Sequence, residues 1–388
     1  MKIVHICHNY IDGQTYQDNE LPQAHARLGH DVTVISTLDF AGSVNFPVNR
    51  SMADRIYTEG ACKIVRLPLR YPADYRFASY KGLYEAIEQE RPALIYFHGL
   101  PYFCYYDIIR YKKRHGCKLA VDFHCDFYNS SHSSLSKRLL HGGLYRSIIH
   151  RTRRYVDQYY GVTPGTIDFV ETMYRLPAGC VKLLPLGGNL HTIDAAAKDS
   201  QGTLQKKEDL RAALGVAPGT KLIVCAGKLD KGKNAAELAA ALAGLEGKDF
   251  LLYLIGPVDE TYRLKIEEAA RGDVRVRLTG WMAPSDLYRC FLAADLGCFP
   301  GSQSVIWQQA ICCGLPLLCR YWPGSEYLDS GGNVRFLAEP SVEALRAALS
   351  ELLADEAELD RMAAISRTLG RPRFSYDRIA QTVLDDLC

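Results

Sequence analysis

Two stretches of this sequence combine small and basic residues in an order suited to binding an anion. Residues 227–234 read Gly-Lys-Leu-Asp-Lys-Gly-Lys-Asn after an apolar segment, and residues 301–304 read Gly-Ser-Gln-Ser before a helix-like run that ends at Cys313. A small-residue loop between a strand and a helix presents backbone N–H groups to an anion, and ammonium groups attract phosphate. The simpler interpretations are an ordinary strand–helix connection and a solvated lysine cluster. A phosphate site is therefore a hypothesis to be weighed against both.

Two histidines lie at the ends of predicted strands. His98 follows the apolar segment 93–97, and His124 follows the segment 118–123. Ligands of open parallel sheets bind at the carboxyl ends of the strands, so both side chains are candidates for contact with a substrate. The alternative for each is a polar residue that only ends a strand.

The elements that must position these residues alternate between strand and helix along the chain. Apolar runs such as 2–7, 31–35, 221–226 and 250–255 predict buried strands, and segments such as 20–28 carry apolar residues on one helical face. This alternation predicts an α/β fold with doubly wound parallel sheets. The loop after the first strand has no GxGxxG pattern, so a dinucleotide site there is not supported.

The length of 388 residues favours two domains. We expect a first domain over residues 1–190 and a second over residues 220–373. The polar stretch 191–219, rich in alanine and lysine, is interpreted as the linker. In the second domain, Ser285 is predicted to cap a helix that ends at Ala293.

Composition excludes several classes of protein. Lys and Arg number 46 against 44 Asp and Glu, so a nucleic-acid binder is not indicated. The thirteen cysteines lack metal-ligand spacing, which favours buried free thiols in a reducing compartment. The first ten residues predict a strand and not a signal peptide, and no apolar run reaches the roughly 18 residues of a transmembrane helix.

Positive charge is concentrated in the first half. Residues 1–190 carry 23 basic and 17 acidic side chains, and residues 127–156 contain no acid. On a helix over 137–154, Leu140, Leu144 and Ile148 would share one face, and Arg138, Arg146 and Arg153 would lie away from it. The pattern is equally typical of a membrane-surface segment and of a surface helix packed on its own domain.

Five short motifs, in sequential order, resemble those of the family-4 glycosyltransferases of the GT-B fold. They are Tyr96-Phe97-His98, residues 185–189, residues 227–234 with Lys228 where the family usually has arginine, residues 309–316, and Phe374-Ser375-Tyr376. The resemblance covers nearly the whole chain. It implies two Rossmann-like domains facing across a cleft, with a nucleotide-sugar bound mainly by the second domain and the acceptor by the first. A C-terminal helix, residues 374–388, would cross back to the first domain.

The resemblance also implies a role for individual residues. Lys228 and Lys233 would neutralise the leaving diphosphate, and His98 would contact the donor sugar or the leaving phosphate, as the catalytic residues. The remaining donor-binding residues would be Gly13, Gly227, Trp281, Met282, Leu287, Gly301, Ser302, Gln303, Ser304, Val305, Gln308 and Gln309. The acceptor side would hold Tyr16, His124 and Asp126. Such enzymes usually retain the anomeric configuration and need no metal or cofactor.

The sequence departs from the family at two glutamates, one of which sits by the donor sugar while the other binds the ribose. Alignment on Gly314 puts Gly301 and Gln309 at these positions, and a slip of one residue puts Gln308 at the second. No glutamate occurs from Leu296 to Ser325. A glutamine bonds ribose hydroxyls as a weaker, neutral partner, and the lost carboxylate is one that could stabilise an oxocarbenium-like transition state. Downstream, Glu326 or Asp329 is a conjectural substitute.

We therefore expect a glycosyltransferase that moves a sugar from a nucleotide-diphosphate donor, most simply a UDP-sugar, to a glycan or lipid-linked acceptor. Its setting would be surface polysaccharide, lipopolysaccharide or glycoconjugate assembly, in the cytoplasm or at the inner face of the membrane, with residues 137–154 on the anionic surface. The alternatives are a degenerate, non-catalytic GT-B protein that binds a nucleotide or a partner, and a sugar-nucleotide epimerase or phosphorylase of the same fold. An epimerase would need a pair of acids to shuttle protons, and none is found in the sequence.

Overall fold

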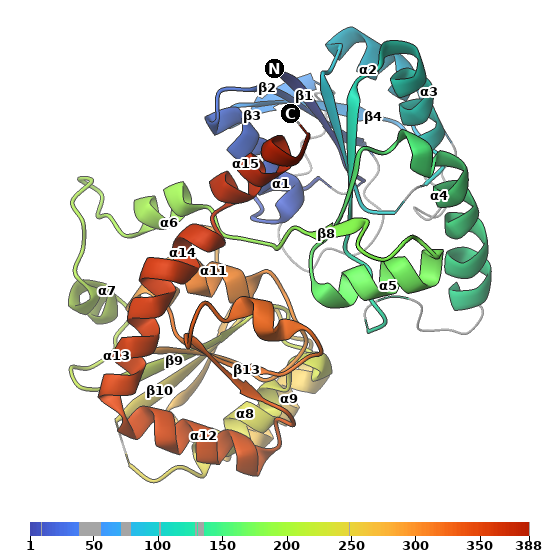
Figure 1. Cartoon of the computed structure of the whole chain (residues 1–388). Coiled ribbons are helices and arrows are strands. Elements are labelled where there is room, and N and C mark those ends of the chain that lie inside the picture. Colours follow the sequence, from blue (N-terminus) through green and yellow to red (C-terminus); the bar gives the residue numbers. More distant parts are fainter. Residues whose placement is uncertain are drawn as a thin grey trace. The chain divides into compact units, whose positions relative to one another are not determined.

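The computed structural model describes residues 1–8, 10–38, 56–70, 79–100, 102–128, 130, 136–247 and 249–387 (Figure 1). The chain divides into two compact units. The first comprises Met1–Leu186 and Tyr376–Cys388, and the second comprises Gly187–Ser375.

The first unit is built on a sheet in the order β3-β4-β2-β1-β5-β6-β7-β8, in which only the β3–β4 pair is antiparallel. Its strands are β1 (Lys2–Ile6), β2 (Asp31–Thr37), β3 (Ile56–Glu59), β4 (Cys62–Leu67), β5 (Leu94–His98), β6 (Lys118–Phe123), β7 (Gln158–Gly161) and β8 (Val181–Leu183). Its helices are α1 (Gln17–Arg27), α2 (Leu83–Glu90), α3 (Tyr105–His115), α4 (Arg146–Thr152), α5 (Pro164–Tyr174) and α15 (Tyr376–Leu387).

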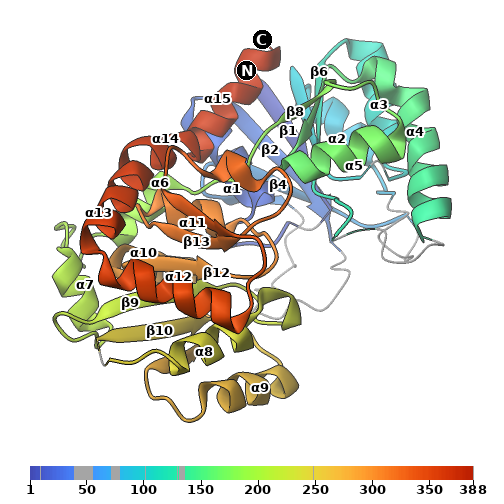
Figure 2. The same cartoon turned by 60° about the horizontal axis from the view of Figure 1, so that its bottom comes forward.

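Helices cover both faces of this sheet. In β1, Val4 and Ile6 pack with residues of α2, α3, α4 and α5, whereas Ile3 packs with residues of α1 and α15. Alternate side chains of a strand point to opposite faces, so His5 lies on the same side as Ile3. Figure 2 shows α15 beside α1, and the two helices are in contact.

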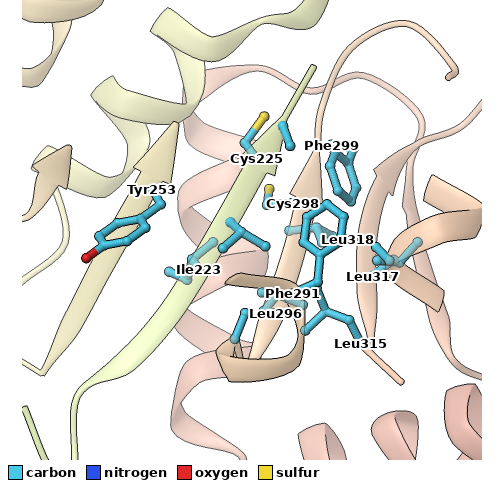
Figure 3. Packing of buried hydrophobic residues seen from close by; sticks show 14 of the residues in the cluster. Ile223, Cys225, Tyr253, Phe291, Leu296, Cys298, Phe299, Leu315, Leu317 and Leu318 are labelled. Atoms are coloured by element: carbon cyan, nitrogen blue, oxygen red, sulfur yellow. The ribbon is translucent and has the colours of Figure 1, made fainter. Parts of the chain in front are cut away.

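The second unit has an all-parallel sheet in the order β11-β10-β9-β12-β13-β14. Its strands are β9 (Lys221–Ala226), β10 (Phe250–Ile255), β11 (Val276–Gly280), β12 (Leu296–Phe299), β13 (Leu317–Arg320) and β14 (Val334–Leu337). Its helices are α6 (Leu190–Ala196), α7 (Lys207–Ala213), α8 (Ala235–Ala243), α9 (Glu260–Ala270), α10 (Pro284–Ala293), α11 (Ile306–Cys312), α12 (Val342–Ala354), α13 (Glu356–Ile365) and α14 (Arg371–Arg373). Figure 3 shows the core around β9, β12 and β13, where Ile223, Cys298 and Leu318 are among the buried side chains.

The predicted doubly wound α/β architecture is confirmed, and two expectations within it differ from the structure. Residues 191–219, interpreted as a linker, lie within the second unit, where α6 and α7 both contact α10. Ser285 is not an N-cap: α10 begins at Pro284, and Ala283 precedes it without a capping side-chain bond. Proline suits the first helical position because its missing N–H would have no helical partner there.

The structure also bears on the thiols and on membrane spanning. Of the twelve cysteines in the described ranges, all are free and eleven are buried, as expected from the sequence. No helix in the described part of the chain is long and apolar enough to span a bilayer.

Candidate functional site

The two candidate anion-binding loops, residues 227–234 and 301–304, pack against each other in the second unit. The loops follow β9 and β12, which are neighbours in the sheet, so both loops emerge at the same edge. The Ser302 N–H donates to the Gly232 carbonyl at 2.8 Å, the Lys233 ammonium donates to the Ser302 carbonyl at 2.7 Å, and the Asn234 amide donates to the Pro300 carbonyl at 2.9 Å. The structure thus brings Lys233 against residues 300–302.

Close packing of these loops explains Gly301. A Cβ on Gly301 would lie 2.3 Å from the Gly232 carbonyl oxygen and 2.3 Å from the Lys233 Cα. Both contacts are with backbone, which cannot swing aside, so only glycine fits. The backbone of Ser302 is likewise used within the protein, because its N–H and carbonyl both form hydrogen bonds with the loop 227–234. The sequence predicted donor binding for both residues, and their contacts in the structure give them a role in joining the two loops.

The Lys233 ammonium is half-buried and is bonded to a backbone carbonyl. Burial lowers its pKa, against the opposing influence of Cys225 and Asp230 nearby. No carboxylate in the described ranges lies within ion-pair distance of it. Lys228 projects from the same loop into solvent, after Gly227, whose φ of +126° favours glycine. A partly buried cation without a carboxylate is unfavourable unless an anion joins it, which is the property a diphosphate site needs.

Residues after Gly301 were expected to hold phosphates through backbone N–H groups. Gln303, Ser304 and Val305 are half-buried at the start of α11. The Ser304 hydroxyl oxygen is shielded from solvent and has no hydrogen-bond partner among the residues described. A shielded hydroxyl of this kind is suited to bonding a ligand oxygen. Phosphate binding by these residues stays a prediction.

The glutamine pair lies inside the unit. Gln309 is 0% exposed and Gln308 is buried beside it in α11. The Gln308 amide nitrogen donates to the Tyr327 hydroxyl at 2.8 Å, and its carbonyl oxygen has no partner within the described part of the chain. Burying an unpaired carboxylate costs far more than burying an amide, so glutamine is the better fit to this environment.

The two conjectural substitutes for the family glutamates are used locally. Exposed Glu326 accepts the Tyr321 hydroxyl at 2.5 Å. One oxygen of Asp329 accepts the N–H groups of Gly332 at 2.6 Å and Asn333 at 2.9 Å, which fixes the turn before β14. Neither arrangement reserves a carboxylate for a substrate.

The residues expected near the base lie at the start of α10: Trp281 and Met282 precede the helix, and Leu287 is in its first turn. Trp281 is exposed, Met282 and Leu287 pack partly against the core, and the Met282 sulfur lies 3.6 Å from the Cys290 thiol. Met282 also lines a cavity of about 550 Å³, together with Asp199, Leu214, Asp286 and Arg289. Contact with a base stays a prediction.

In the first unit, His98 belongs to a chain of buried histidines. β5 and β6 pair so that His98 lies opposite Asp122, and His98 Nδ1 is 3.1 Å from Asp122 Oδ2. His98 Nε2 is 3.0 Å from His5 Nδ1, and His5 Nε2 is 3.0 Å from His25 Nδ1. The chain runs from the end of β6 through β5 and β1 to α1.

Asp122 sets the direction of this chain. Burial would raise the pKa of Asp122, but the imidazoles of His98 and His124 hold it well below its usual range, so it is a carboxylate and accepts from His98 Nδ1–H. Burial and the neighbouring histidines lower the pKa of His5, and burial lowers that of His25 to about 3, so both are neutral. His98 Nε2 then accepts from His5 Nδ1–H, and His5 Nε2 accepts from His25 Nδ1–H.

His124 is the accessible member of the cluster. Its side chain is 39% exposed, and its Nε2 lies 3.4 Å from Asp122 Oδ1. Burial opposes the change, but Asp122 and then Asp18 raise the pKa of His124. Burial raises the pKa of Asp18, whose Oδ1 lies 3.3 Å from His98 Nδ1. Both ring nitrogens of His98 are therefore engaged inside the unit, and His124 is the better placed of the two to meet a substrate.

Sequence reasoning missed four members of this cluster: His5, His25, Asp18 and Asp122. The available signals were a histidine in the apolar run 2–7 and an aspartate in the apolar run 118–123, because a polar residue inside a buried strand needs a partner.

Three further residues predicted to contact a substrate, Gly13, Tyr16 and Asp126, lie outside the histidine chain. Gly13 has a φ of +74°, and its N–H donates to Glu59 Oε1 at 2.7 Å. Tyr16 is exposed directly before α1, and Asp126 accepts the Tyr128 N–H at 2.8 Å, in a local turn. Substrate contact by these residues stays a prediction.

The basic segment combines a packed face with an exposed one. A π-helix, Ser136–Tyr145, continues into α4. Leu140, Leu144 and Ile148 pack on the core of the first unit, as the packed-helix interpretation requires. The exposed side chains are Lys137, Arg138, Leu139, His150, Arg151, Arg153 and Arg154, whereas Arg146 is half-buried. Residues 129 and 131–135 of the acid-free stretch lie outside the described ranges.

Comparison with known proteins agrees with this arrangement. Residues 11–191 match the sequence model of Glycosyltransferase Family 4, and residues 206–368 match the model of Glycosyl transferases group 1. A search of curated proteins returned no match.

Solved structures share the fold at low sequence identity. Sucrose-phosphate synthase from Thermosynechococcus elongatus is 17% identical with a TM-score of 0.72, covering 99% of this chain and 97% of that one. WaaG, a glycosyltransferase involved in lipopolysaccharide biosynthesis, is 17% identical with a TM-score of 0.64, at 100% and 99% coverage. Anabaena Alr3699/HepE in complex with UDP and glucose is 16% identical with a TM-score of 0.69, at 99% and 98% coverage. The sequence matches to both halves establish that the chain belongs to the family-4 glycosyltransferases, and the solved structures show that it shares the GT-B fold.

Proposed function

We propose that this protein transfers a sugar from a nucleotide-diphosphate donor to an acceptor hydroxyl, with a UDP-sugar as the first donor to test. The observation that carries the proposal is Lys233, a half-buried ammonium that bonds the Ser302 carbonyl and has no ion-pair partner among the described residues. The HepE structure, which contains UDP and glucose, supports the choice of donor.

The chemistry follows from charge. Breaking the glycosidic bond leaves a nucleoside diphosphate with growing negative charge, and fixed cations that meet this charge lower the barrier. Lys233 is held by the Ser302 carbonyl, so its position is set before a donor arrives. Lys228, exposed on the same loop, would add a second positive charge but without the bidentate geometry of arginine.

The finer features of the reaction rest on the family resemblance. We propose retention of anomeric configuration, and no requirement for a metal or cofactor. Proton NMR of the first product formed from an α-linked donor would test the stereochemistry, because the coupling of the anomeric proton differs between the two anomers. Activity that persists after chelation would test the metal requirement.

The acceptor is proposed to be a glycan or a lipid-linked glycan in surface polysaccharide or similar assembly, in the cytoplasm or at the membrane. The exposed cluster of Arg151, Arg153 and Arg154 supports a peripheral association with an anionic bilayer. Sedimentation with phosphatidylglycerol vesicles should fall when all three become glutamate. A triple change at exposed Lys198, Lys206 and Lys265, which alters the net charge equally, should have little effect.

The first experiment is a thermal-shift and hydrolysis screen against UDP-, GDP-, ADP- and dTDP-sugars. Stabilisation by one nucleotide with slow hydrolysis is expected, and it would identify the donor. If no nucleotide stabilises the protein, the donor site built on Lys233 is wrong.

One observation favours a second candidate, a non-catalytic protein that binds a nucleotide. No glutamate lies between Leu296 and Ser325, and Glu326 and Asp329 are used elsewhere. Tight binding of a nucleotide-sugar with no turnover, even in the presence of lipid-linked acceptors, would favour this candidate over the transferase.

A further inference from the structure

We propose that Asp18, His98 and His124 form a binding site for one divalent transition-metal ion, with Zn²⁺ as the best match. One ligand atom from each residue lies within 4.8 Å of the others, and His98 Nδ1 is 3.3 Å from Asp18 Oδ1. Zinc holds nitrogen and oxygen ligands at about 2.0–2.2 Å, which places neighbouring ligand atoms of a tetrahedral site about 3.3 Å apart. Small side-chain movements would therefore close the group around an ion.

The number of donors in the cluster argues for a cation. His98 Nδ1 carries at most one hydrogen, yet it faces two carboxylates, Asp122 at 3.1 Å and Asp18 at 3.3 Å. A single N–H cannot fully satisfy both, and the longer distance exceeds that of an ordinary N–H···O bond. Among the residues that the structure describes, these two aspartates form ion pairs only with histidines. Two carboxylates with neutral imidazoles match the charge of one divalent ion.

The buried histidine chain supplies the outer support that metal-bound histidines need. A ligating histidine normally donates its other ring N–H to a neighbouring acceptor, which fixes its orientation. When His98 Nδ1 binds a metal, its hydrogen sits on Nε2 and is donated to His5 Nδ1 at 3.0 Å, and His5 Nε2–H is donated to His25 Nδ1. Each of the three histidines keeps one hydrogen, so the chain reverses direction without gaining or losing a proton. On the other side, the Gly99 N–H holds Asp122 Oδ1 at 3.1 Å.

The ligand types select the class of metal. Two imidazoles and a carboxylate suit Zn²⁺, Co²⁺ or Ni²⁺ better than Mg²⁺ or Ca²⁺, which prefer all-oxygen sites. The partly exposed side chain of His124 offers a route from solvent, and Asp122 or a water is available as the fourth ligand. The transfer proposed above needs no metal, so this ion would not be the catalyst. By occupying both histidines it would act as an inhibitor, a consequence that rests on the proposed function, whereas the binding itself does not.

Isothermal titration of the untagged full chain with ZnCl₂ tests the site, with Co²⁺ as a spectroscopic probe of coordination. We expect one ion per chain and intense visible absorption from Co²⁺, as four- or five-coordinate cobalt gives. Asp18→Asn and His124→Gln should each weaken binding by about 10-fold or more. His115→Gln is the matched control, because His115 is a partly exposed histidine next to Glu88 on the same unit and is no part of the cluster.

Two results would overturn the proposal. One is the absence of Zn²⁺ binding by the wild-type chain. The other is wild-type affinity in both Asp18→Asn and His124→Gln, which would place the ion elsewhere, for example on thiols. Thermal unfolding of each variant shows whether it is folded, and His124→Gln carries the test if Asp18→Asn is not, since the His124 side chain is substantially exposed.

Discussion

Lys233 makes a hydrogen bond that helps to hold two loops together, and its positive charge has no ion-pair partner among the described residues. Its ammonium bonds the Ser302 carbonyl at 2.7 Å and so helps to join two loops, while burial lowers its pKa. Neighbouring Lys231 differs from it in being solvent-exposed on the same loop. The pair allows the buried charge to be tested against a charge of equal sign two positions away.

Replacing Lys233 by methionine should reduce donor turnover by about 100-fold or more, because it removes a fixed charge facing the leaving diphosphate. Lys231→Met should stay within a few-fold of the wild type. Steady-state hydrolysis of the nucleotide-sugar identified in the screen measures both. Comparable activity in the two variants would show that Lys233 serves only to hold Ser302.

The sequence predicts some of the candidate site residues, but it does not predict the long-range contacts that bring them together. Lys228 and Lys233 were predictable as candidate phosphate ligands because they stand in one short motif after a strand, where spacing alone is informative. Their surroundings were not, since the bond from Lys233 to Ser302 joins residues 69 positions apart. His5 and His25 were missed for the same reason: His5 meets His98 across 93 positions, and only the order of strands in the sheet brings them together.

At the scale of elements, the joined loops after β9 and β12 depend on a glycine. Gly301→Ala should destabilise the second unit by about 1–3 kcal/mol and weaken nucleotide binding, because its Cβ would meet backbone atoms at 2.3 Å. Gly165→Ala is the control: its Cβ would meet only the Thr163 hydroxyl, at 3.7 Å, in the first turn of α5. Thermal unfolding with and without nucleotide measures both effects. If Gly301→Ala binds the nucleotide as well as the wild type does, close packing of the two loops is not needed for binding.

Element types were predictable from local pattern, and their assignment to units was less so. The strands 118–123 and 221–226 were delimited by their apolar runs alone, and the structure has them as β6 and β9. Residues 191–219 look like a linker because they are polar, yet α7 buries Leu210 in the core of the second unit. One buried leucine in a polar stretch is too weak a signal to show packing against α10 in advance.

Glu90 ties the end of α2 to the sheet and gives the first unit a dependence on pH. It lies 2.7 Å from the Lys2 ammonium and 2.6 Å from that of Lys63, and it accepts the Thr33 hydroxyl at 2.8 Å. Burial would raise its pKa, but these bonds lower it to about 2, from an ordinary value of 4.5. Because the folded pKa is the lower one, the stabilisation is present above pH 4.5 and is lost as the pH falls towards 2.

Glu90→Gln should therefore lower the free energy of unfolding by about 1–2 kcal/mol near neutral pH, a figure reduced for the solvent exposure of Lys63. The difference from wild type should shrink as the pH is lowered to about 3. Glu88→Gln, on the exposed side of the same helix, should have little effect at either pH. Denaturant unfolding at the two pH values measures this, and a difference that stays constant with pH would contradict the assignment.

On the scale of the whole molecule, the chain leaves the first unit at Leu186 and returns to it at Tyr376. The returning helix α15 is amphipathic: Ile379, Ala380 and Val383 are buried with residues of α1 and β1, while Asp385 is exposed. Asp377 adds an ion pair to Arg27 at 2.7 Å, and the Tyr160 hydroxyl donates to Asp386 at 3.0 Å. The first unit is therefore incomplete until residues 376–387 have been synthesised, which links its folding to that of the intervening second unit.

The substitution Ile379→Ala, in α15, tests whether the stability of the first unit depends on this returning helix. Removing a buried isoleucine leaves a cavity and should destabilise the first unit by about 2–4 kcal/mol. The second unit, folded on its own core, should keep its stability, so unfolding should become resolved into two transitions. Limited proteolysis should then cut the first unit earlier than the second, whereas Asp385→Ala should behave as wild type. Earlier cleavage within Gly187–Ser375 instead would show that α15 stabilises the second unit, contrary to the division seen here.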